Sequence, residues 1–276
     1  MADEDIRVGL IGAGGNVRNR HITGFRKVKG VAIVGVVNRS LESTCGRPIQ
    51  HSPARRKERH TMATVMSPPE QRIVLDNITW DVYEQLLATH RDRSVPRFTY
   101  DRGRLEIMSP SAEHEELKHM VALFVEVIAE EMNINVRGLG STTFRREDLQ
   151  RGFEPDACFY VQSATRIRGK TEIDLTIDPP PDVVIEVDLT NPSLAKFPIF
   201  AQLGVPEVWR YDGRQWQIFK LVGEESVKQL QSTAFPGLTA EVMTDLLDES
   251  RSLERLVWLR RVRTWIREQC TGEVPR

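Results

Sequence analysis

Residues 178–200 read DPPPDVVIEVDLTNPSLAKFPIF, and this stretch decides the fold. Three prolines precede Val183–Leu189, whose apolar side chains are typical of a buried strand. Two carboxylates interrupt that run, at Glu186 and Asp188. Because side chains two positions apart on a strand point the same way, both carboxylates share one face. Lys196 follows on the next predicted helix, close enough to reach back toward them.

Two carboxylates on a buried strand need a partner, because an unpaired buried charge is costly. A second strand, predicted over residues 156–161, begins at Asp156. Asp156 and Glu186 would form a minimal cradle for Mg²⁺ or Mn²⁺, which bind carboxylate oxygens and keep several waters. The metal would lower the pKa of a bound water, and Lys196 would orient that water or offset negative charge. The alternative is that these carboxylates are turn or strand-end groups that face solvent.

The chain on either side of these strands predicts a mixed α/β domain with one core sheet and flanking helices. Thr79 is a predicted N-cap for a helix through Leu87. Residues 97–108 predict a hairpin that turns at DRG, and a helix from SPS to Met132 follows it. Further strands are expected at residues 141–144, 207–211 and 215–221, and further helices at 194–203 and 253–269.

The helix that begins after Ser111 carries acidic residues and a histidine in its first turns. At 100° per residue, Glu113 points to the middle of the apolar stripe, whereas His114 and Glu116 lie on its borders. Any of these three could face a site, and Glu115 is expected in solvent. A structural role is the alternative for His114. The apolar stripe comprises Leu117, Met120, Val121, Phe124, Val127 and Ile128.

Composition narrows the class of protein. The 276 residues include 38 Lys and Arg against 39 Asp and Glu, so a uniformly basic nucleic-acid coat is excluded. The three cysteines form no C-x-x-C pair, which argues against a zinc ribbon or redox dithiol and fits a reducing compartment. The acidic start differs from a signal peptide, and residues 31–37 are too short to span a bilayer. We therefore expect a cytoplasmic protein that does not contact membranes.

The N-terminal residues have a different pattern. Ile6–Ile11 and residues 31–37 predict two buried strands around a helix, with Gly12, Gly14 and Gly15 in the first turn. This is the arrangement of a dinucleotide-binding βαβ unit. Its glycines let the backbone approach a pyrophosphate, and the helix N-terminus offers free N–H groups to the anion.

The segments VGLIGAGGNVRNRHITGF and VAIVGVVNRS resemble the start of Gfo/Idh/MocA oxidoreductases. Val17 stands where the third motif glycine belongs, and Arg39 lies where a ribose-contacting acid would lie. We interpret residues 1–44 as a truncated, vestigial Rossmann-type fragment and do not expect it to bind NAD(P). Residues 45–66 then form a linker, whose basic run RRKERH is solvated or a DNA-contacting arm, and 67–276 form the main domain.

A second resemblance is carried by LEIMSPSAEHEEL, GSTTF, EPDACFY and DPPPDVVIEVDLTNPSLAKFPIFAQLGVPEVWRYDG. These segments resemble the Uma-two family of restriction-endonuclease-like proteins, which belongs to the PD-(D/E)XK nuclease superfamily. The resemblance covers nearly all of residues 72–270 and keeps the motifs in family order. It implies a restriction-endonuclease-like mixed sheet with flanking helices.

The resemblance also assigns roles by position. Asp156 would be the motif aspartate and Glu186 the motif acid. The superfamily motif places lysine two positions after the acid, where this chain has Asp188, an additional ligand or an outer acid. Lys196 matches the place to which the family moves its lysine, and His114 matches another family position.

The implied function is Mg²⁺- or Mn²⁺-dependent hydrolysis of phosphodiester bonds, with DNA as the substrate. The alternatives are a catalytically silent nuclease-fold binding module and an NAD(P)-binding, oxidoreductase-like protein. Aromatic residues of the predicted strands could stack on bases or belong to the core: Tyr160, Trp209, Tyr211 and Trp216. Arginines of the last helix could meet phosphates, face solvent or form a homodimer surface: Arg251, Arg255, Arg260, Arg261, Arg263 and Arg267.

Overall fold

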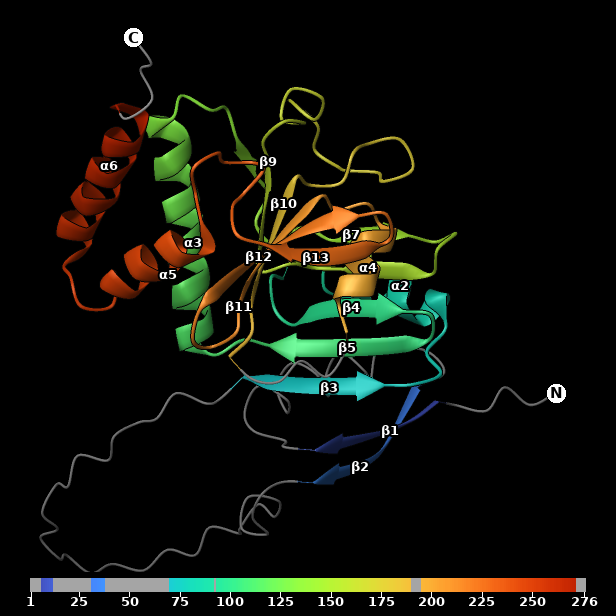
Figure 1. The fold of residues 1–276 in the computed structure, drawn as a ribbon. Helices are drawn as coiled ribbons and strands as arrows, with labels where there is room; N and C mark the ends of the chain where they lie inside the picture. The colour runs from blue at the N-terminus through green and yellow to red at the C-terminus, as the bar shows by residue number, and fades with distance from the viewer. Residues whose placement is uncertain (1–5, 12–30, 38–69, 92, 190–194, 272–276) are drawn as a thin grey trace, which may run out of the picture.

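A computed structural model gives the architecture of the chain, and it describes residues 6–11, 31–37, 70–91, 93–189 and 195–271 (Figure 1). The first two segments are β1 (Ile6–Ile11) and β2 (Val31–Val37), which pair in parallel as a separate two-stranded sheet. Both strands were expected. The predicted helix between them, and Gly12, Gly14 and Gly15, lie outside the described residues.

The first sheet of the main domain has five strands in the order β3-β5-β4-β8-β7, and the pairs are antiparallel. The strands are β3 (Gln71–Leu75), β4 (Arg97–Asp101), β5 (Arg104–Ser109), β7 (Phe144–Arg146) and β8 (Arg151–Phe153). Helix α2 (Trp80–Thr89) begins at Thr79, whose hydroxyl accepts from the Val82 N–H as expected for an N-cap. Buried aromatic side chains of α2 and β4 form the core beneath this sheet, with Tyr83 stacked on Tyr100.

The second sheet has six strands in the order β13-β12-β11-β10-β9-β6. They are β6 (Arg137–Gly138), β9 (Ala157–Tyr160), β10 (Val183–Val187), β11 (Glu207–Tyr211), β12 (Trp216–Val222) and β13 (Glu225–Gln229). Only β10 and β11 pair in parallel within this sheet. The helices are α3 (Ala112–Glu131), α4 (Phe197–Gln202), α5 (Ala240–Glu249) and α6 (Arg255–Thr271).

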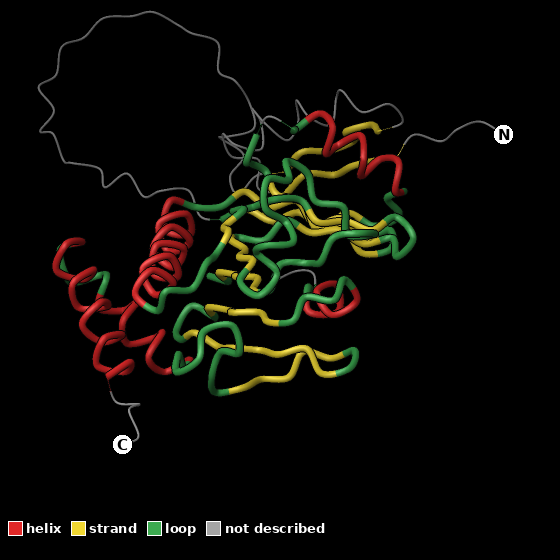
Figure 2. Tube along the Cα trace, turned by 90° about the horizontal axis from the view of Figure 1, so that it is seen from above, coloured by secondary structure: helices red, strands yellow, loops and turns green. Residues whose placement is uncertain are grey.

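Alternation along β10 assigns one set of helices to each face of the six-stranded sheet. Val183, Ile185 and Val187 pack in a cluster with α3, α5 and α6. Val184 belongs to a different cluster, which includes residues of α4. Figures 1 and 2 show α3, α5 and α6 gathered on one side of this sheet. A strand that is buried on both faces has an almost continuous apolar sequence, as this one does.

The α/β class, the mixed sheet and the flanking helices are confirmed, but the expectation of one core sheet was wrong. Strand β8 pairs with β4, whereas β9 pairs with β10, although only three residues separate β8 from β9. The turn at Glu154-Pro155 therefore moves the chain from one sheet to the other. Proline suits this place because it cannot donate to a strand ladder.

Candidate active site between the two sheets

The pairing of β9 with β10 brings Asp156 close to the end of β10. The register pairs Val184 with Cys158 and Ile185 with Ala157, which is its last pair. The Asp156 N–H donates to the Ile185 carbonyl at 3.2 Å, one residue out of that register, so Asp156 lies just before the regular ladder of β9. Asp156 and Glu186 are both buried, with exposed fractions of 1% and 3%.

Asp156 is surrounded by hydrogen-bond partners from three elements. Its Oδ2 accepts from the Val187 N–H at 2.6 Å. Its Oδ1 lies 2.8 Å from His114 Nε2 and also forms an ion pair with Arg97 of β4. These contacts hold the Asp156 carboxylate in one orientation.

His114 links Asp156 to a second carboxylate. It is fully buried in the first turn of α3, and its N–H donates to the N-cap hydroxyl of Ser111 at 3.1 Å. Its Nδ1 lies 2.7 Å from Glu70 Oε2. Burial opposes ionisation of Glu70, but His114 and Arg72 lower the pKa of that carboxyl to about 2. The ring is therefore held between two acids.

Glu186 meets the lysine that follows β10. Lys196, at the N-cap of α4, donates from Nζ to Glu186 Oε2 at 2.6 Å, and its own exposed fraction is 8%. Burial raises the pKa of Glu186, Lys196 opposes that rise and the charge of Asp188 adds to it. The other oxygen, Oε1, is buried and has no hydrogen-bond partner among the described residues. Glu186 thus keeps one oxygen available inside the site.

Asp188 joins the two sheets. Its Oδ2 accepts from Arg210 Nε of β11 at 2.6 Å, and its Oδ1 accepts from Arg72 of β3 at 3.4 Å. Arg72 also contacts Glu70 at 2.5 Å and Glu106 of β5 at 3.1 Å. The position two residues after Glu186 therefore carries an acid that is neutralised by two arginines.

Several residues of this cluster were missed by reasoning from the sequence: Glu70, Arg72, Arg97, Glu106 and Arg210. Four of them are charged side chains at strand positions, as in RIVL and RLEIM, whereas Glu70 precedes β3 and carries no such signal. Such positions indicate a buried ionic cluster only once the strands are known to meet.

The prediction for the start of α3 was partly wrong. Glu113 and Glu116 are exposed, and only His114 of the three candidates faces the site. Glu115, which was expected in solvent, forms ion pairs with Arg97 and Lys118. The angular argument considered the helix alone, whereas the long side chain of Arg97 reaches the helix from β4.

The aromatic and arginine candidates lie in structural positions. Tyr160, Trp209, Tyr211 and Trp216 are all buried in the core, so they offer no face to a base. Most of the predicted arginines around α6 contact neighbouring helices or strands. Arg251 donates to the Tyr211 hydroxyl, Arg261 pairs with Glu249, Arg263 with Glu130 and Glu131, and Arg267 with Glu131.

A small cavity opens beside the carboxylates. It has a volume of about 200 Å³, and Glu186, Asp188, Lys196 and Arg210 line it together with Phe197 and Phe200. In the part of the chain that the structure describes, no three His, Cys, Asp or Glu side chains form a group that could hold a metal. Mg²⁺ keeps several of its waters and can be held by two carboxylates. Glu186, whose Oε1 has no hydrogen-bond partner among the described residues, lines the cavity and offers one carboxylate oxygen to such an ion, whereas Asp156 is not among the lining residues.

Residues 80–253 match the model of the Uma2 family, described as "Putative restriction endonuclease". The match begins at residue 80 and gives no support to the oxidoreductase resemblance of residues 1–44. No curated protein matches the chain. Among the described residues, no helix is both long enough and apolar enough to cross a bilayer.

One similar solved structure is a putative nuclease belonging to DUF820 from Anabaena variabilis ATCC 29413. It is 16% identical, has a TM-score of 0.43, and the alignment covers 62% of this chain and 99% of that one. The family model, by contrast, spans more than half of the chain and includes the strands that carry both carboxylates. The chain therefore belongs to the Uma2 family of putative restriction endonucleases.

Proposed function

We propose that the protein is a Mg²⁺- or Mn²⁺-dependent endonuclease that hydrolyses phosphodiester bonds in DNA. The observation that carries the proposal is the pairing of β9 with β10, which places the Asp156 carboxylate at the Val187 N–H, next to Glu186 and the Lys196 bound to it. Family membership supports the nuclease class, and the metal and DNA are inferred from the chemistry of the carboxylates.

Asp156 and Glu186 would hold the metal. The bound metal would lower the pKa of a coordinated water and offset negative charge on the phosphate. Asp156 cannot rotate freely, because Val187 and His114 fix its two oxygens. Lys196 would position the attacking water or stabilise developing charge, since its ammonium group lies at Glu186 beside the cavity.

Arg97 has a separate task in this scheme. It is buried between Asp156 and Glu115, and burial lowers its pKa although the charge of Glu115 opposes this. Arginine remains charged even so, because its ordinary pKa exceeds 12. We propose that Arg97 neutralises Asp156 until a cation binds and then remains close to the reacting phosphate.

The test compares cleavage of supercoiled and linear DNA by the purified protein in Mg²⁺, in Mn²⁺ and in EDTA. Asp156→Asn and Glu186→Gln are expected to remove metal-dependent cleavage. Asp182→Asn is the matched control, because Asp182 is a buried carboxylate just before β10 that binds backbone N–H groups of Val161 and Ser163. It should cleave like the wild type.

Two outcomes would contradict the proposal. Undiminished cleavage by Asp156→Asn would remove the assigned ligand from the mechanism. A wild-type protein that neither cleaves DNA nor binds Mn²⁺ by calorimetry would be a silent binding module with a nuclease fold.

A further inference from the structure

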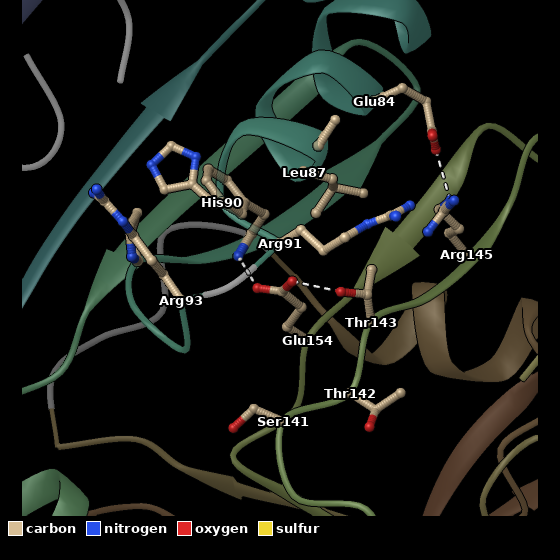
Figure 3. Close-up of a pocket in the computed structure, with 13 residues that line it drawn as sticks. Glu84, Leu87, His90, Arg91, Arg93, Ser141, Thr142, Thr143, Arg145 and Glu154 are labelled. Atoms are coloured by element: carbon tan, nitrogen blue, oxygen red, sulfur yellow. Dashed lines mark hydrogen bonds and ion pairs between the residues drawn. The ribbon is translucent and has the colours of Figure 1, made fainter. Parts of the chain in front are cut away.

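The pocket in Figure 3, which lies beside α2, is lined by polar side chains that bind one another. Glu154 accepts from the Thr143 hydroxyl at 2.6 Å and from the Phe98 N–H at 2.8 Å. Glu84 pairs with Arg145 at 2.6 Å. These groups are satisfied within the protein and indicate no ligand. A groove between α5 and α6 differs, because its charged rim is not satisfied in this way.

The groove between α5 and α6 has a volume of about 530 Å³. Val242, Leu246 and Trp265 supply its apolar side chains. Asp245 and Asp248 line the same groove and are exposed, so its rim is acidic. Figure 1 shows α6 outside α3, on the side away from the six-stranded sheet. An apolar hollow with an acidic rim suits apolar side chains that are flanked by basic residues.

The acids of this rim are not neutralised within the described part of the chain. Asp245 has no ion pair with another described residue, and Asp248 has only an exposed contact of 4.0 Å with Arg251. The other two charged residues of the lining, Glu249 and Arg261, pair with each other at 3.4 Å. Two carboxylates at the groove are therefore available to basic side chains.

The residues at the start of α6 have the complementary character. The described residues expose seven large apolar side chains, and three of these lie within five positions: Leu253, Leu256 and Val257. Single exposed apolar residues are common, whereas a cluster of them is typical of an interaction surface. Arg255 and Arg260 flank this cluster, are exposed and form no ion pair with another described residue.

The apolar cluster and the groove belong to one surface. Ser252 lines the groove, and Leu253 follows it directly. Val257 lies four residues before Arg261 and eight before Trp265, and both of these line the groove. Because residues four apart share one face of a helix, Val257 lies one turn beyond the groove on the same face of α6. The surface thus carries an acidic hollow and a basic, apolar projection side by side.

We propose that this surface, made of the groove and residues 253–260, joins two copies of the chain in a two-fold dimer. In such a dimer a patch meets the same patch of the second copy, so each copy supplies the groove once and the cluster once. Leu256 and Val257 of one copy enter the groove of the other, and Arg255 and Arg260 meet the acids of its rim.

Two observations favour a second copy over a different protein. A different protein would need only one of the two complementary halves, whereas this chain carries both on one surface. The net charge of the chain is −1, so little overall repulsion opposes the association of two copies. The inference is independent of the proposed function, because it concerns a surface outside the candidate active site.

The experiment measures the mass of the full-length protein by sedimentation equilibrium at micromolar concentration. The wild type should have twice the 31.5 kDa of one chain. Asp245→Arg/Asp248→Arg makes both halves of the surface basic, and Arg255→Glu/Arg260→Glu makes both halves acidic. Each variant alone should dimerise at least about a hundredfold more weakly, because like charges then face each other. An equimolar mixture of the two variants should form dimers again, because each reversed side chain then meets an opposite charge.

A second variant tests the apolar contact without a change of charge. Leu256 is 68% exposed, so Leu256→Gln should leave the monomer folded. It should weaken the dimer by about a hundredfold, because two-fold symmetry removes the buried leucine twice. Ile177→Gln is the matched control, since Ile177 is 72% exposed in the turn after Asp174, outside α5 and α6. This control should dimerise like the wild type.

Three outcomes would overturn the proposal. A monomeric wild type would leave the groove to a different partner. Dimers of wild-type strength in both charge-reversed variants would show that the copies associate through another surface. A mixture that stays monomeric, although each variant unfolds in urea as cooperatively as the wild type, would show that the acidic and basic halves do not meet. DNA cleavage is not measured, so the proposed function stands or falls separately.

Discussion

The buried pair of Glu186 and Lys196 allows the stability and the chemistry of the site to be separated. We consider Glu186→Met, Lys196→Met and the double variant. Each single change leaves one charge buried without its partner, because the exposed fractions of the two side chains are 4% and 8%. Breaking a buried pair in this way costs about 3–5 kcal/mol of the free energy of unfolding. Lys196→Met should cost less than Glu186→Met, since burial already raises the pKa of Glu186 and the acid can take up a proton.

The double variant should be close to the wild type, because replacing a buried ion pair by apolar groups is often neutral or stabilising. The coupling energy, which is the cost of the double change minus the costs of both single changes, then has a magnitude of about 6–10 kcal/mol. Urea unfolding, monitored by tryptophan fluorescence, gives the free energies of unfolding of the wild type, both single variants and the double variant. Lys170→Met is the control, because Lys170 is 38% exposed in its pair with Asp178, and its loss should cost less than about 1 kcal/mol.

Calorimetric titration with Mn²⁺ completes the test. Lys196→Met keeps both carboxylates and should bind Mn²⁺ at least as tightly as the wild type, whereas Glu186→Met should not bind it. Simple additivity of the two single changes, or Mn²⁺ binding retained by a folded Glu186→Met protein, would refute the reasoning.

Three further predictions concern stability. Glu70, with its pKa lowered from 4.5 to about 2, should contribute about 3 kcal/mol when ionised. This contribution is present above pH 4.5 and is lost as the pH falls toward 2. The free energy of unfolding of the wild type should therefore decrease over this pH range, and Glu70→Gln should remove that decrease. Gly152→Ala should cost about 1–3 kcal/mol, because a Cβ there would collide with the buried Tyr83 hydroxyl, and an unchanged melting temperature would contradict this. Ser111→Ala should cost about 1 kcal/mol, since its hydroxyl caps α3 at His114, whereas Ser111→Thr should retain most of the cap.

Local signals in the sequence predicted many of the elements. The N-cap at Thr79, the hairpin of β4 and β5, and the helix after Ser111 were confirmed because each depends on neighbours a few residues away. Strand β11 was predicted with its observed bounds. Strands β3, β6, β8 and β13 and helix α5 were not predicted, and the strand expected at residues 141–144 overlaps β7 only at Phe144. The division into two sheets also could not be, since it depends on which distant strands pair after Glu154-Pro155.

For the candidate site, the sequence predicted only the relation between residues that are close along the chain. Spacing alone placed Glu186 and Asp188 on one face, and in the structure both line the same cavity, whereas Asp156 is not among its lining residues. The counter-ions come from far along the chain, with Arg72 lying 116 positions from Asp188. No periodic pattern connects residues so distant, so the arginines that neutralise the acids emerge only when the two sheets pack.

Alternation along β10 has a consequence for how this protein evolves. Val183, Ile185 and Val187 pack against helices, so these positions tolerate exchange among apolar residues of similar size. Glu186 and Asp188, by contrast, are held by ion pairs with basic side chains. A lineage without the proposed reaction would keep the first set for folding, and it would lose an acid of the second set only together with the buried counter-ion, because a lone buried charge costs about 3–5 kcal/mol. Joint replacement of Glu186 and Lys196 by apolar residues would therefore mark descendants that retain only the scaffold.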